Sequence, residues 1–547
     1  MTVDLGRAEA DAVRSRVEAE ILPRTLGEFV RERAQTLGSA TVGHWFDTGE
    51  QLTYRDLDEA ADRLAASLLR VGVRKGTHVA VALPNIAAYP ISWIAIARIG
   101  AVMVPVNTTY TGEELQFILG DSDAQFCIVN AGMLDQFASI SELPALLSLD
   151  RIIVHGAETA PDGMLSWSAL LEAGEGAFDP PVDVEPSDLL NLQYTSGTTG
   201  FPKGCMLTHD YWMLIACHVE YQIGFEGDAC NVLIWQPFFY MDPMWQFLLA
   251  MRRGGTAYVA GRMSLSRFHD WLRDYPIHYC IYPEPALKQL EPSPRDREYA
   301  LRYISVFSWR EEARREVEDR LGVVARECFG MTEVGMATFV PQSATHIAYQ
   351  RSCGVVLPYR ELRVVDGEGR DVPEGEVGEL WIAGRAILLG YYKRPQANAE
   401  TFTGRWFHSG DLCRRDAQGY YYIVGRIKDM IKRSGENIAA IEVEAALRAI
   451  PDVEEAAVVA VPDPLRREEV KAYLKLREGV APDQVPPEMV IEHCRTRLAA
   501  FKLPRYVAYQ DGDFPRTGSR KIAKQVLKDQ LQDLRIGSYD FQDKLWR

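Results

Sequence analysis

The apolar residues of this chain form two kinds of pattern. Residues 57–73 place apolar side chains three or four positions apart, which predicts a helix with one buried face. Short, mainly apolar runs at 79–83, 102–106 and 124–129 predict buried strands, and helical patterns stand between them. Strands that alternate with helices favour parallel sheets that are covered by helices on both faces.

Other segments before residue 354 add further predicted elements. Residues 1–40 have a helical pattern whose apolar face includes Leu26 and Phe29. Residues 157–186 are rich in acids, Gly and Pro, which predicts a surface connection. The same reasoning predicts strands at 41–45, 51–54, 188–194, 232–239 and 257–260.

The composition and the hydrophobic pattern of the sequence change after Gly354. Glycines become frequent, and the alternating pattern at 420–424 predicts a small β-rich region. Helical patterns at 441–450 and 489–498 then flank a strand-like run at 455–461. A compact C-terminal domain of roughly a hundred residues is a plausible size. We therefore place a domain boundary between residues 427 and 428.

Composition restricts the function. The 547 residues suggest more than one domain, and the formal net charge of −16 argues against nucleic-acid or anionic-membrane binding. The nine cysteines contain no Cys-x-x-Cys pair, which is typical of reduced thiols in a cytosolic protein. The most apolar stretch, 89–106, contains Arg98 and Pro105, which favours a buried element over a membrane span. We expect a cytoplasmic protein that needs no membrane.

One stretch, residues 194–204, is unusually rich in groups that bind phosphate. It reads Tyr-Thr-Ser-Gly-Thr-Thr-Gly-Phe-Pro-Lys-Gly. Glycine lets backbone N–H groups approach a ligand, hydroxyls donate hydrogen bonds to oxyanions, and lysine adds a positive charge. The stretch predicts a polyphosphate-binding loop with these candidate ligands: Thr195, Ser196, Gly197, Thr198, Thr199 and Lys203.

Two other interpretations of this stretch are weaker. A surface turn can be rich in Gly and Thr, but a dense set of hydroxyls beside a lysine is unusual. The P-loop pattern requires Gly-Lys-Ser/Thr after a spacer, whereas Lys203 precedes Gly204. Residues 194–204 closely resemble the phosphate-binding signature of the adenylate-forming superfamily, which includes acyl-CoA synthetases, peptide-synthetase adenylation domains and firefly-type luciferases.

The resemblance implies a fold as well as an activity. We expect an α/β protein whose large N-terminal domain, 1–427, contains two parallel-type sheets and a small β-rich subdomain. A small, mobile α+β C-terminal domain, 428–547, should complete it. The resemblance also implies ATP, Mg²⁺ and CoA as cofactors, and a small carboxylic acid as substrate.

Residues 329–333, Phe-Gly-Met-Thr-Glu, resemble the second signature of the superfamily. The resemblance implies that Phe329 lies near the adenine, that Thr332 contacts the α-phosphate and that Glu333 holds Mg²⁺. The chemistry agrees, because a hard cation needs oxygen ligands and an aromatic face suits a purine. Taken alone, the pentapeptide could equally contain a core phenylalanine and an exposed glutamate.

Motifs nearer the C-terminus resemble the ribose and hinge signatures. Asp411, in residues 408–412, is expected to accept hydrogen bonds from the ribose hydroxyls, because a carboxylate only accepts. Arg426 is expected near ribose or phosphate, and Lys428 matches the residue about which the C-terminal domain turns. A separate loop is expected to enter the site for the thioester step, with residues Ser434, Gly435 and Glu436.

Lys521 is expected to be the adenylation lysine. It lies in residues 515–522, Pro-Arg-Thr-Gly-Ser-Arg-Lys-Ile, which resemble the motif that carries this residue. A cation that contacts both the carboxylate and the α-phosphate would offset their mutual repulsion and stabilise the transition state. A lone lysine near a C-terminus is usually a surface charge, so the order and spacing of all five motifs support this assignment. The catalytic set is Lys521, Thr332 and Glu333.

Three positions depart from the pattern of the superfamily. Arg520 stands where glycine is common, Tyr240 replaces a usual His, and Trp309 stands near an expected glycine-rich segment. These departures concern the identity of the substrate more than the reaction. The predicted acyl pocket is rich in aromatic residues, which suggests a sizeable apolar acid: Trp235, Phe239, Tyr240, Trp309, Met331 and Met336.

The sequence therefore predicts an ATP-dependent acyl-CoA synthetase that makes an acyl-adenylate and then an acyl-CoA thioester. Three alternatives remain at this point: an enzyme that loads a carrier protein, a catalytically silent ATP-binding relative and, more remotely, a luciferase-type monooxygenase. The oligomeric state is open, and a homodimer is compatible with the sequence.

Overall fold

The computed structural model describes most of the chain, in two compact units. The described residues are 4–174, 178, 183–195, 202–224, 228–289, 291, 293–307, 309, 311–434, 436–516 and 522–547. Unit 1 comprises Met1–Thr195, Lys203–Glu361 and Ala383–Arg405, and unit 2 comprises Ser196–Pro202, Leu362–Ile382 and Trp406–Arg547. The boundary between 427 and 428 concerns a rotation of the C-terminal domain, and it stays a prediction.

The first sheet of unit 1 has seven strands in the order β7-β6-β5-β3-β4-β8-β9. All neighbouring strands are parallel except β8 and β9, which form an antiparallel pair. The strands that carry the short apolar runs are completely buried at the centre, as their sequence pattern predicts. The bounds are β3 (His78–Ala82), β4 (Val102–Pro105), β5 (Phe126–Asn130), β6 (Ile152–His155), β7 (Leu165–Ser166), β8 (Leu189–Thr195) and β9 (Lys203–Thr208).

The second sheet of unit 1 has nine strands in the order β16-β15-β14-β13-β12-β10-β11-β1-β2. The strands from β14 to β1 are parallel, and antiparallel strands close both edges. The prediction of two parallel-type sheets is therefore confirmed. The bounds are β1 (Thr41–Trp45), β2 (Glu50–Thr53), β10 (Val232–Ile234), β11 (Ala257–Val259), β12 (Tyr279–Ile281), β13 (Tyr303–Val306), β14 (Val324–Met331), β15 (Gly335–Phe339) and β16 (Val355–Val356).

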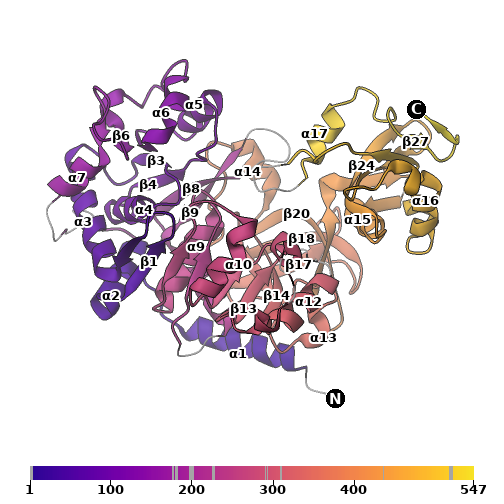
Figure 1. Cartoon of the computed structure of the whole chain (residues 1–547), viewed down its shortest axis with the longest axis horizontal. Helices are drawn as coiled ribbons and strands as arrows, with labels where there is room; N and C mark the ends of the chain where they lie inside the picture. Colours follow the sequence, from indigo (N-terminus) through magenta and orange to yellow (C-terminus); the bar gives the residue numbers. More distant parts are fainter. Residues whose placement is uncertain are drawn as a thin grey trace. The chain divides into compact units, whose positions relative to one another are not determined.

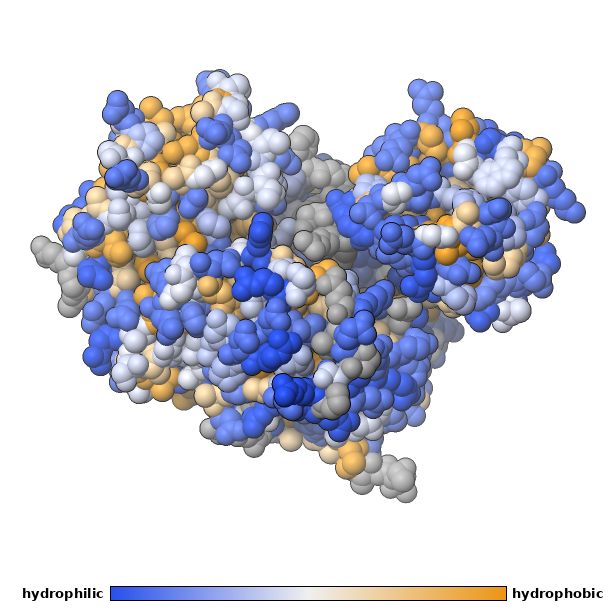
Figure 2. Space-filling model, viewed as in Figure 1, coloured by the Kyte–Doolittle hydropathy of each residue, from blue (hydrophilic) through white to orange (hydrophobic). Residues whose placement is uncertain are grey.

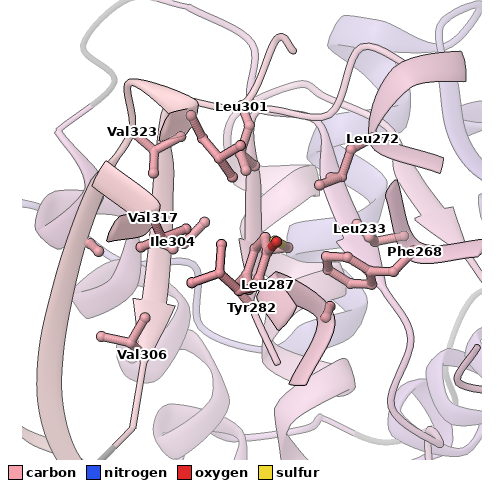
Figure 3. Packing of buried hydrophobic residues seen from close by; sticks show 14 of the residues in the cluster. Leu233, Phe268, Leu272, Tyr282, Leu287, Leu301, Ile304, Val306, Val317 and Val323 are labelled. Carbon is pink, nitrogen blue, oxygen red and sulfur yellow. The ribbon is translucent and has the colours of Figure 1, made fainter. Parts of the chain in front are cut away.

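Helices cover these sheets, and their labels can be followed in Figure 1. Figure 3 shows part of the packing beneath them, where Phe268 and Tyr282 point toward one another with ring centroids 5.0 Å apart. The helices of unit 1 are α1 (Leu5–Ala19), α2 (Leu26–Leu37), α3 (Tyr54–Arg70), α4 (Ala88–Ile99), α5 (Gly112–Asp121), α6 (Leu134–Ala138), α7 (Trp167–Ala173), α8 (His209–Ile223), α9 (Met241–Arg252), α10 (Leu265–Asp274), α11 (Glu284–Gln289), α12 (Glu311–Leu321), α13 (Thr345–Ala348) and α14 (Pro395–Thr401).

The most apolar stretch of the sequence is a buried helix and strand. Every residue of α4 is buried, including Arg98, which forms ion pairs with Asp58 and Asp62 of α3. Burial raises the pKa of the Asp62 carboxyl, and the guanidinium of Arg98 opposes that shift. Within the described residues, no helix combines the length and the apolar composition that a bilayer crossing requires.

Three predicted elements differ from the structure. Residues 1–40 form two helices with a break at 20–25, because Pro23 interrupts the pattern and Thr25 caps α2. The strand predicted at 232–239 ends at Ile234, where Gln236 and Pro237 begin a turn. The segment 157–186 is more than a surface connection, since it contains α7 with the buried Trp167.

Unit 2 contains two further sheets. In the first, β18 pairs antiparallel with β20, and β20 with β21. In the second, β24 pairs antiparallel with β25, and β26 lies parallel to β25. The strands are β17 (Arg360–Val365), β18 (Val377–Gly384), β20 (Trp406–Arg415), β21 (Tyr421–Arg426), β22 (Met430–Arg433), β23 (Glu436–Ala439), β24 (Val453–Asp463), β25 (Arg467–Leu476), β26 (Tyr506–Tyr509), β27 (Tyr539–Asp540) and β28 (Leu545–Trp546), and the helices are α15 (Ala440–Arg448), α16 (Pro487–Arg495) and α17 (Lys524–Asp529).

The surface and the cysteines agree with the composition. Hydrophilic residues dominate the face drawn in Figure 2, and apolar residues occur there in small groups. All nine cysteines are free, and eight of them are buried. The burial of eight thiols is compatible with a structural role.

The Arg98 cluster gives a test of the core of unit 1. Arg98→Met should lower the free energy of unfolding by about 3 kcal/mol, because the buried Asp62 would keep only Arg31 as a cation and the partly buried Asp58 would lose its ion pair with Arg98. Chemical denaturation monitored by tryptophan fluorescence measures the change. Arg24→Met is the control, since Arg24 and its partner Glu185 are both solvent-exposed and the pair should contribute little. Equal effects of the two substitutions would contradict this account.

Candidate active site

The hairpin of β8 and β9 presents the predicted phosphate loop. Thr195, the last residue of β8, is paired with Lys203, the first residue of β9. Gly204 permits the close packing of the hairpin, because a Cβ there would lie 3.2 Å from the ring of Tyr194. The hairpin thus brings Thr195 and Lys203 together at the base of the loop, as predicted. The predicted ligands Ser196, Gly197, Thr198 and Thr199 lie outside the described residues.

A second hairpin, of β14 and β15, carries Thr332 and Glu333 in its turn. Gly330 is required at the end of β14, because a Cβ there would lie 2.4 Å from the carbonyl oxygen of Gly335. Gly335 begins β15 with φ +66°, a left-handed conformation that favours glycine. The hydroxyl of Tyr211 on α8 donates to the carbonyl oxygen of Thr332 at 2.9 Å, and this hydrogen bond attaches the turn to α8.

Tyr391 joins these two hairpins, and sequence reasoning missed it. Its hydroxyl donates to Oε1 of Glu333 at 2.9 Å, and Nζ of Lys203 lies 4.5 Å from the centroid of its ring. Glu333 is only 8% exposed, so its carboxylate is held inside the protein. The sequence signal is Gly390-Tyr391-Tyr392, and of these residues only the glycine contributes to the predicted β-rich region.

The backbone around Tyr391 is attached to both hairpins. The N–H of Leu388 donates to the carbonyl oxygen of Glu333 at 2.7 Å. The N–H of Met206 on β9 donates to Gly390 at 3.0 Å, and the N–H of Tyr392 donates to Gly204 at 2.9 Å. The predicted phosphate lysine and the predicted metal glutamate therefore belong to one hydrogen-bonded frame within unit 1.

Cys205 experiences the charges of both Lys203 and Glu333. Cys205 follows Gly204 on β9 and is completely buried. Burial raises the pKa of its thiol, the negative charge of Glu333 raises it further, and the positive charge of Lys203 lowers it. Both charges therefore act on the same buried atom.

In unit 2, the structure pairs two of the predicted nucleotide-binding residues. Asp411 on β20 lies opposite Arg426 on β21, and Nε of Arg426 is 2.8 Å from Oδ1 of Asp411. Asp411 is 3% exposed, and its N–H donates to the Ser409 hydroxyl. The oxygens of a carboxylate only accept hydrogen bonds. The pair is therefore suited to accept hydrogen bonds from a diol.

Three other predicted residues of unit 2 are exposed. Lys428 is exposed in a short 3-10 turn, Ile427–Asp429. Ser434 and Glu436 are exposed, and Ser434 has φ +51° between β22 and β23. Gly435 and Lys521 lie outside the described residues, as does Arg520.

Comparison with known proteins identifies the family. Residues 30–392 match the AMP-binding enzymes, and residues 442–521 match the AMP-binding enzyme C-terminal domain. The chain belongs to the AMP-binding enzyme family. The two matches leave residues 1–29, 393–441 and 522–547 outside them.

Individual relatives of this AMP-binding enzyme are CoA ligases. It is 32% identical to 4-coumarate–CoA ligase-like 9 of Oryza sativa subsp. japonica, over 93% of each chain. It is 29% identical to crotonobetaine/carnitine–CoA ligase of Salmonella typhimurium, over 87% of this chain and 93% of that one. The solved structure of ATP-bound MatB from Rhodopseudomonas palustris is 25% identical, with a TM-score of 0.81 and coverage of 93% and 99%.

These relationships confirm four predictions made from the sequence. They are the adenylate-forming superfamily, the multi-sheet α/β fold with a smaller C-terminal part, the AMP-forming acid–CoA ligase, and ATP, Mg²⁺ and CoA as its cofactors. The roles of individual site residues stay predictions.

The residues around Glu333 fit a magnesium ion that arrives with a nucleotide. Among the described residues, no group of three or more His, Cys, Asp or Glu side chains could hold a metal by itself. Mg²⁺ is commonly bound by one or two carboxylates, with phosphate oxygens and waters as the other ligands. A single buried carboxylate beside a lysine matches that donor set.

The predicted acyl residues fall into three groups. Met331 and Met336 flank the turn that carries Glu333. Phe239 and Tyr240 precede α9, and their ring centroids are 4.6 Å apart. The other two pack on the buried cluster of Figure 3: Trp309 contacts Tyr282 edge-on at 5.8 Å, and Nε1 of Trp235 donates to Ile281 at 2.7 Å.

Arg360 is a second residue that sequence reasoning missed. It is 3% exposed, and its guanidinium donates to the backbone carbonyls of Met336 at 3.0 Å and Val334 at 2.7 Å. It also donates to the carbonyls of Tyr359 and Arg385. Burial lowers the pKa of Arg360 to about 10. The side chain therefore ties the strand after Glu333 to the segment that leads to Tyr391.

Arg360→Met tests this attachment. We expect a loss of unfolding free energy on the order of 3 kcal/mol, because buried carbonyls would lose their donors. Arg360→Lys should recover only part of it, since an ammonium cannot reach all four oxygens. Thermal and urea unfolding measure both variants. A Met variant as stable as the wild type would show that Arg360 does not support the hairpin.

Proposed function

We propose that this enzyme activates a sizeable, mainly apolar carboxylic acid and transfers the acyl group to the thiol of CoA. The observation that carries the proposal is the frame of Lys203, Tyr391 and Glu333 within unit 1. It holds a cation and a carboxylate beside the predicted phosphate loop, and a metal-bound triphosphate requires both charges.

In the first step, a carboxylate oxygen of the acid attacks the α-phosphorus of ATP and pyrophosphate leaves. Two anions must approach each other, so cations have to offset their repulsion. We assign this role to Lys203 and Lys521, and the contact with the α-phosphate to Thr332. Mg²⁺, which Glu333 would hold when it is bound, neutralises phosphate charge. Asp411 and Arg426 would orient the ribose, and Phe329 the adenine.

In the second step, the thiol of CoA attacks the carbonyl carbon of the acyl-adenylate. A C–S bond forms, the bond to AMP breaks, and the thiol proton is lost. We propose that residues 428–547 turn about Lys428 between the two steps. The exposed turn of Lys428 supports this, since a hinge must change its backbone torsions without disrupting a core. The loop of Ser434, Gly435 and Glu436 would then enter the site.

The nature of the acid is inferred from the predicted acyl residues. All six are aromatic or thioether side chains, which favours an apolar substrate. The name of one relative, 4-coumarate–CoA ligase-like 9, refers to an aromatic acid and supports the same class. Core packing is an alternative role for Trp309, which is 5% exposed.

A substrate screen tests the proposal. Purified enzyme with Mg²⁺ and ATP is given aliphatic, aromatic and polycyclic carboxylic acids, and pyrophosphate release is measured. Acids that cause pyrophosphate release are then assayed with CoA and with a carrier protein, and mass spectrometry detects the thioester. We expect AMP and an acyl-CoA. Thioester on the carrier alone would favour the carrier-loading alternative, and no AMP with any acid would refute the proposal.

Lys521→Ala should slow adenylation by on the order of 10²–10³-fold, the size expected for the loss of one transition-state donor. Pyrophosphate exchange measures this step. The same variant should still convert synthetic acyl-adenylate and CoA to thioester, because Lys521 would have left the site by then. Undiminished exchange would remove Lys521 from the catalytic set.

Asp411→Ala should raise KM for ATP roughly 10- to 100-fold, because hydrogen bonds to a charged group are lost. ATP and 2′-deoxy-ATP are compared in the exchange assay with wild type and variant. The wild type should prefer ATP, and the variant should lose most of that preference. A variant that keeps the full preference would show that Asp411 does not bind the ribose.

A further inference from the structure

Tyr391 lies between two side chains of opposite charge and contacts both. Nζ of Lys203 is 4.5 Å from the centroid of its ring, and its hydroxyl donates to Glu333 at 2.9 Å. The side chain of Tyr391 is almost completely buried, at 6% exposure. Its two contacts use different parts of one residue, the face of the ring and the phenol O–H.

The position of Tyr391 is set through its backbone. Asn398 on α14 accepts from the N–H of Tyr391 at 2.7 Å and donates to its carbonyl at 2.9 Å. Gly390, with φ +137°, allows this approach, because a Cβ there would meet the side chain of Asn398 at 3.2 Å. The two hydrogen bonds therefore fix the backbone position from which the ring of Tyr391 projects.

A lysine and a glutamate that contact the same tyrosine have opposite charges and could form an ion pair. Among the ion pairs within the described residues, none joins Lys203 to Glu333. If they did pair, each charge would neutralise the other, and both would be less available to a phosphate or a metal ion. The tyrosine satisfies the ammonium with a ring face and the carboxylate with a hydroxyl, and neither contact removes a charge.

The next residue along the chain shows the contrasting arrangement. The hydroxyl of Tyr392 donates to Oδ2 of Asp123 at 2.8 Å, and Nζ of Lys393 lies 5.4 Å from the centroid of its ring. Here the lysine also forms a direct ion pair with the aspartate. A tyrosine, a lysine and a carboxylate can therefore also be arranged so that the lysine pairs directly with the carboxylate.

On the basis of the proposed function, we infer that Tyr391 is a positioning residue that keeps Lys203 and Glu333 apart. It holds the lysine ready for phosphate oxygens and the carboxylate ready for the metal. The hydroxyl governs the metal side and the ring governs the phosphate side, so the two effects can be separated by substitution.

Tyr391→Phe removes only the hydroxyl. The affinity for ATP in EDTA should stay within about twofold of the wild type, since the ring face still holds Lys203. Mg²⁺ should increase the affinity for ATP. The Mg²⁺ concentration at the midpoint of this increase should be roughly tenfold higher in the variant, because Glu333 loses a hydrogen bond that orients it. Isothermal titration calorimetry measures both quantities without any carboxylic acid, and Mn²⁺ electron paramagnetic resonance reports the metal directly.

Tyr391→Leu removes the ring as well. Lys203 and Glu333 should then pair, so ATP binding in EDTA should weaken roughly tenfold in addition to the change in Mg²⁺ dependence. Circular dichroism and thermal unfolding check that the variant folds. If it does not fold, Tyr391→Phe alone decides the inference through the Mg²⁺ dependence.

Tyr392→Phe is the matched control, because it removes the same kind of hydrogen bond from the neighbouring residue. It should bind ATP and Mg²⁺ as the wild type does. An unchanged Mg²⁺ dependence in Tyr391→Phe, or an equal shift in Tyr392→Phe, would overturn the inference. Pyrophosphate release by the wild type is measured with the acid panel on the same preparation. A wild type that releases no pyrophosphate would count against the proposed function, whereas the binding measurements on the Tyr391 variants test the inference by themselves.

Discussion

Two opposite charges that must both serve a ligand have to stay close together without neutralising each other. In this enzyme the charges are the Lys203 ammonium and the Glu333 carboxylate, and Tyr391 separates them. The hydroxyl of Tyr391 hydrogen-bonds the carboxylate and its ring contacts the ammonium, and neither contact neutralises a charge. A direct ion pair would neutralise both charges. The neighbouring cluster of Tyr392, Lys393 and Asp123 shows what the same chemistry does when direct pairing is possible.

This separation depends on a rigid backbone frame. The β8–β9 hairpin supplies Lys203 and the β14–β15 hairpin supplies Glu333, although the two hairpins belong to different sheets. The segment 388–392 bridges them with main-chain hydrogen bonds. Each bond is worth little alone, but together they fix three side chains at the spacing that the electrostatics require.

Buried arginines support the frame in two ways. Arg98 is neutralised by two aspartates, so it stabilises the packing of α3 against α4 and leaves no charge for function. Arg360 binds backbone carbonyls instead, and burial lowers its pKa to about 10. A guanidinium suits this task because its planar fork can donate to several oxygens at once. In unit 2, the Asp411–Arg426 pair provides a similarly fixed carboxylate.

The sequence by itself determined the family, the reaction class and the alternation of strands and helices. These are local properties: the loop at 194–204, the Phe-Gly-Met-Thr-Glu turn and the short apolar runs each carry their chemistry within a few residues. It also singled out Lys203, Glu333 and Asp411, which lie at the start of β9, in the turn between β14 and β15, and within β20. Two of its errors, at 20–25 and 232–239, concern the ends of elements, where a proline or a turn interrupts the hydrophobic pattern. The third is the helix α7 within 157–186, which the acid-, Gly- and Pro-rich composition did not predict.

Only the tertiary structure decided which distant residues act together. Tyr391 follows Lys203 by almost two hundred positions, and no local pattern distinguishes it from Tyr392, yet only Tyr391 reaches Glu333. Arg360 looks like a surface charge in the sequence and is buried among carbonyls in the fold. Such contacts depend on how strands that are remote in the chain are brought side by side, and that information is spread over the whole core.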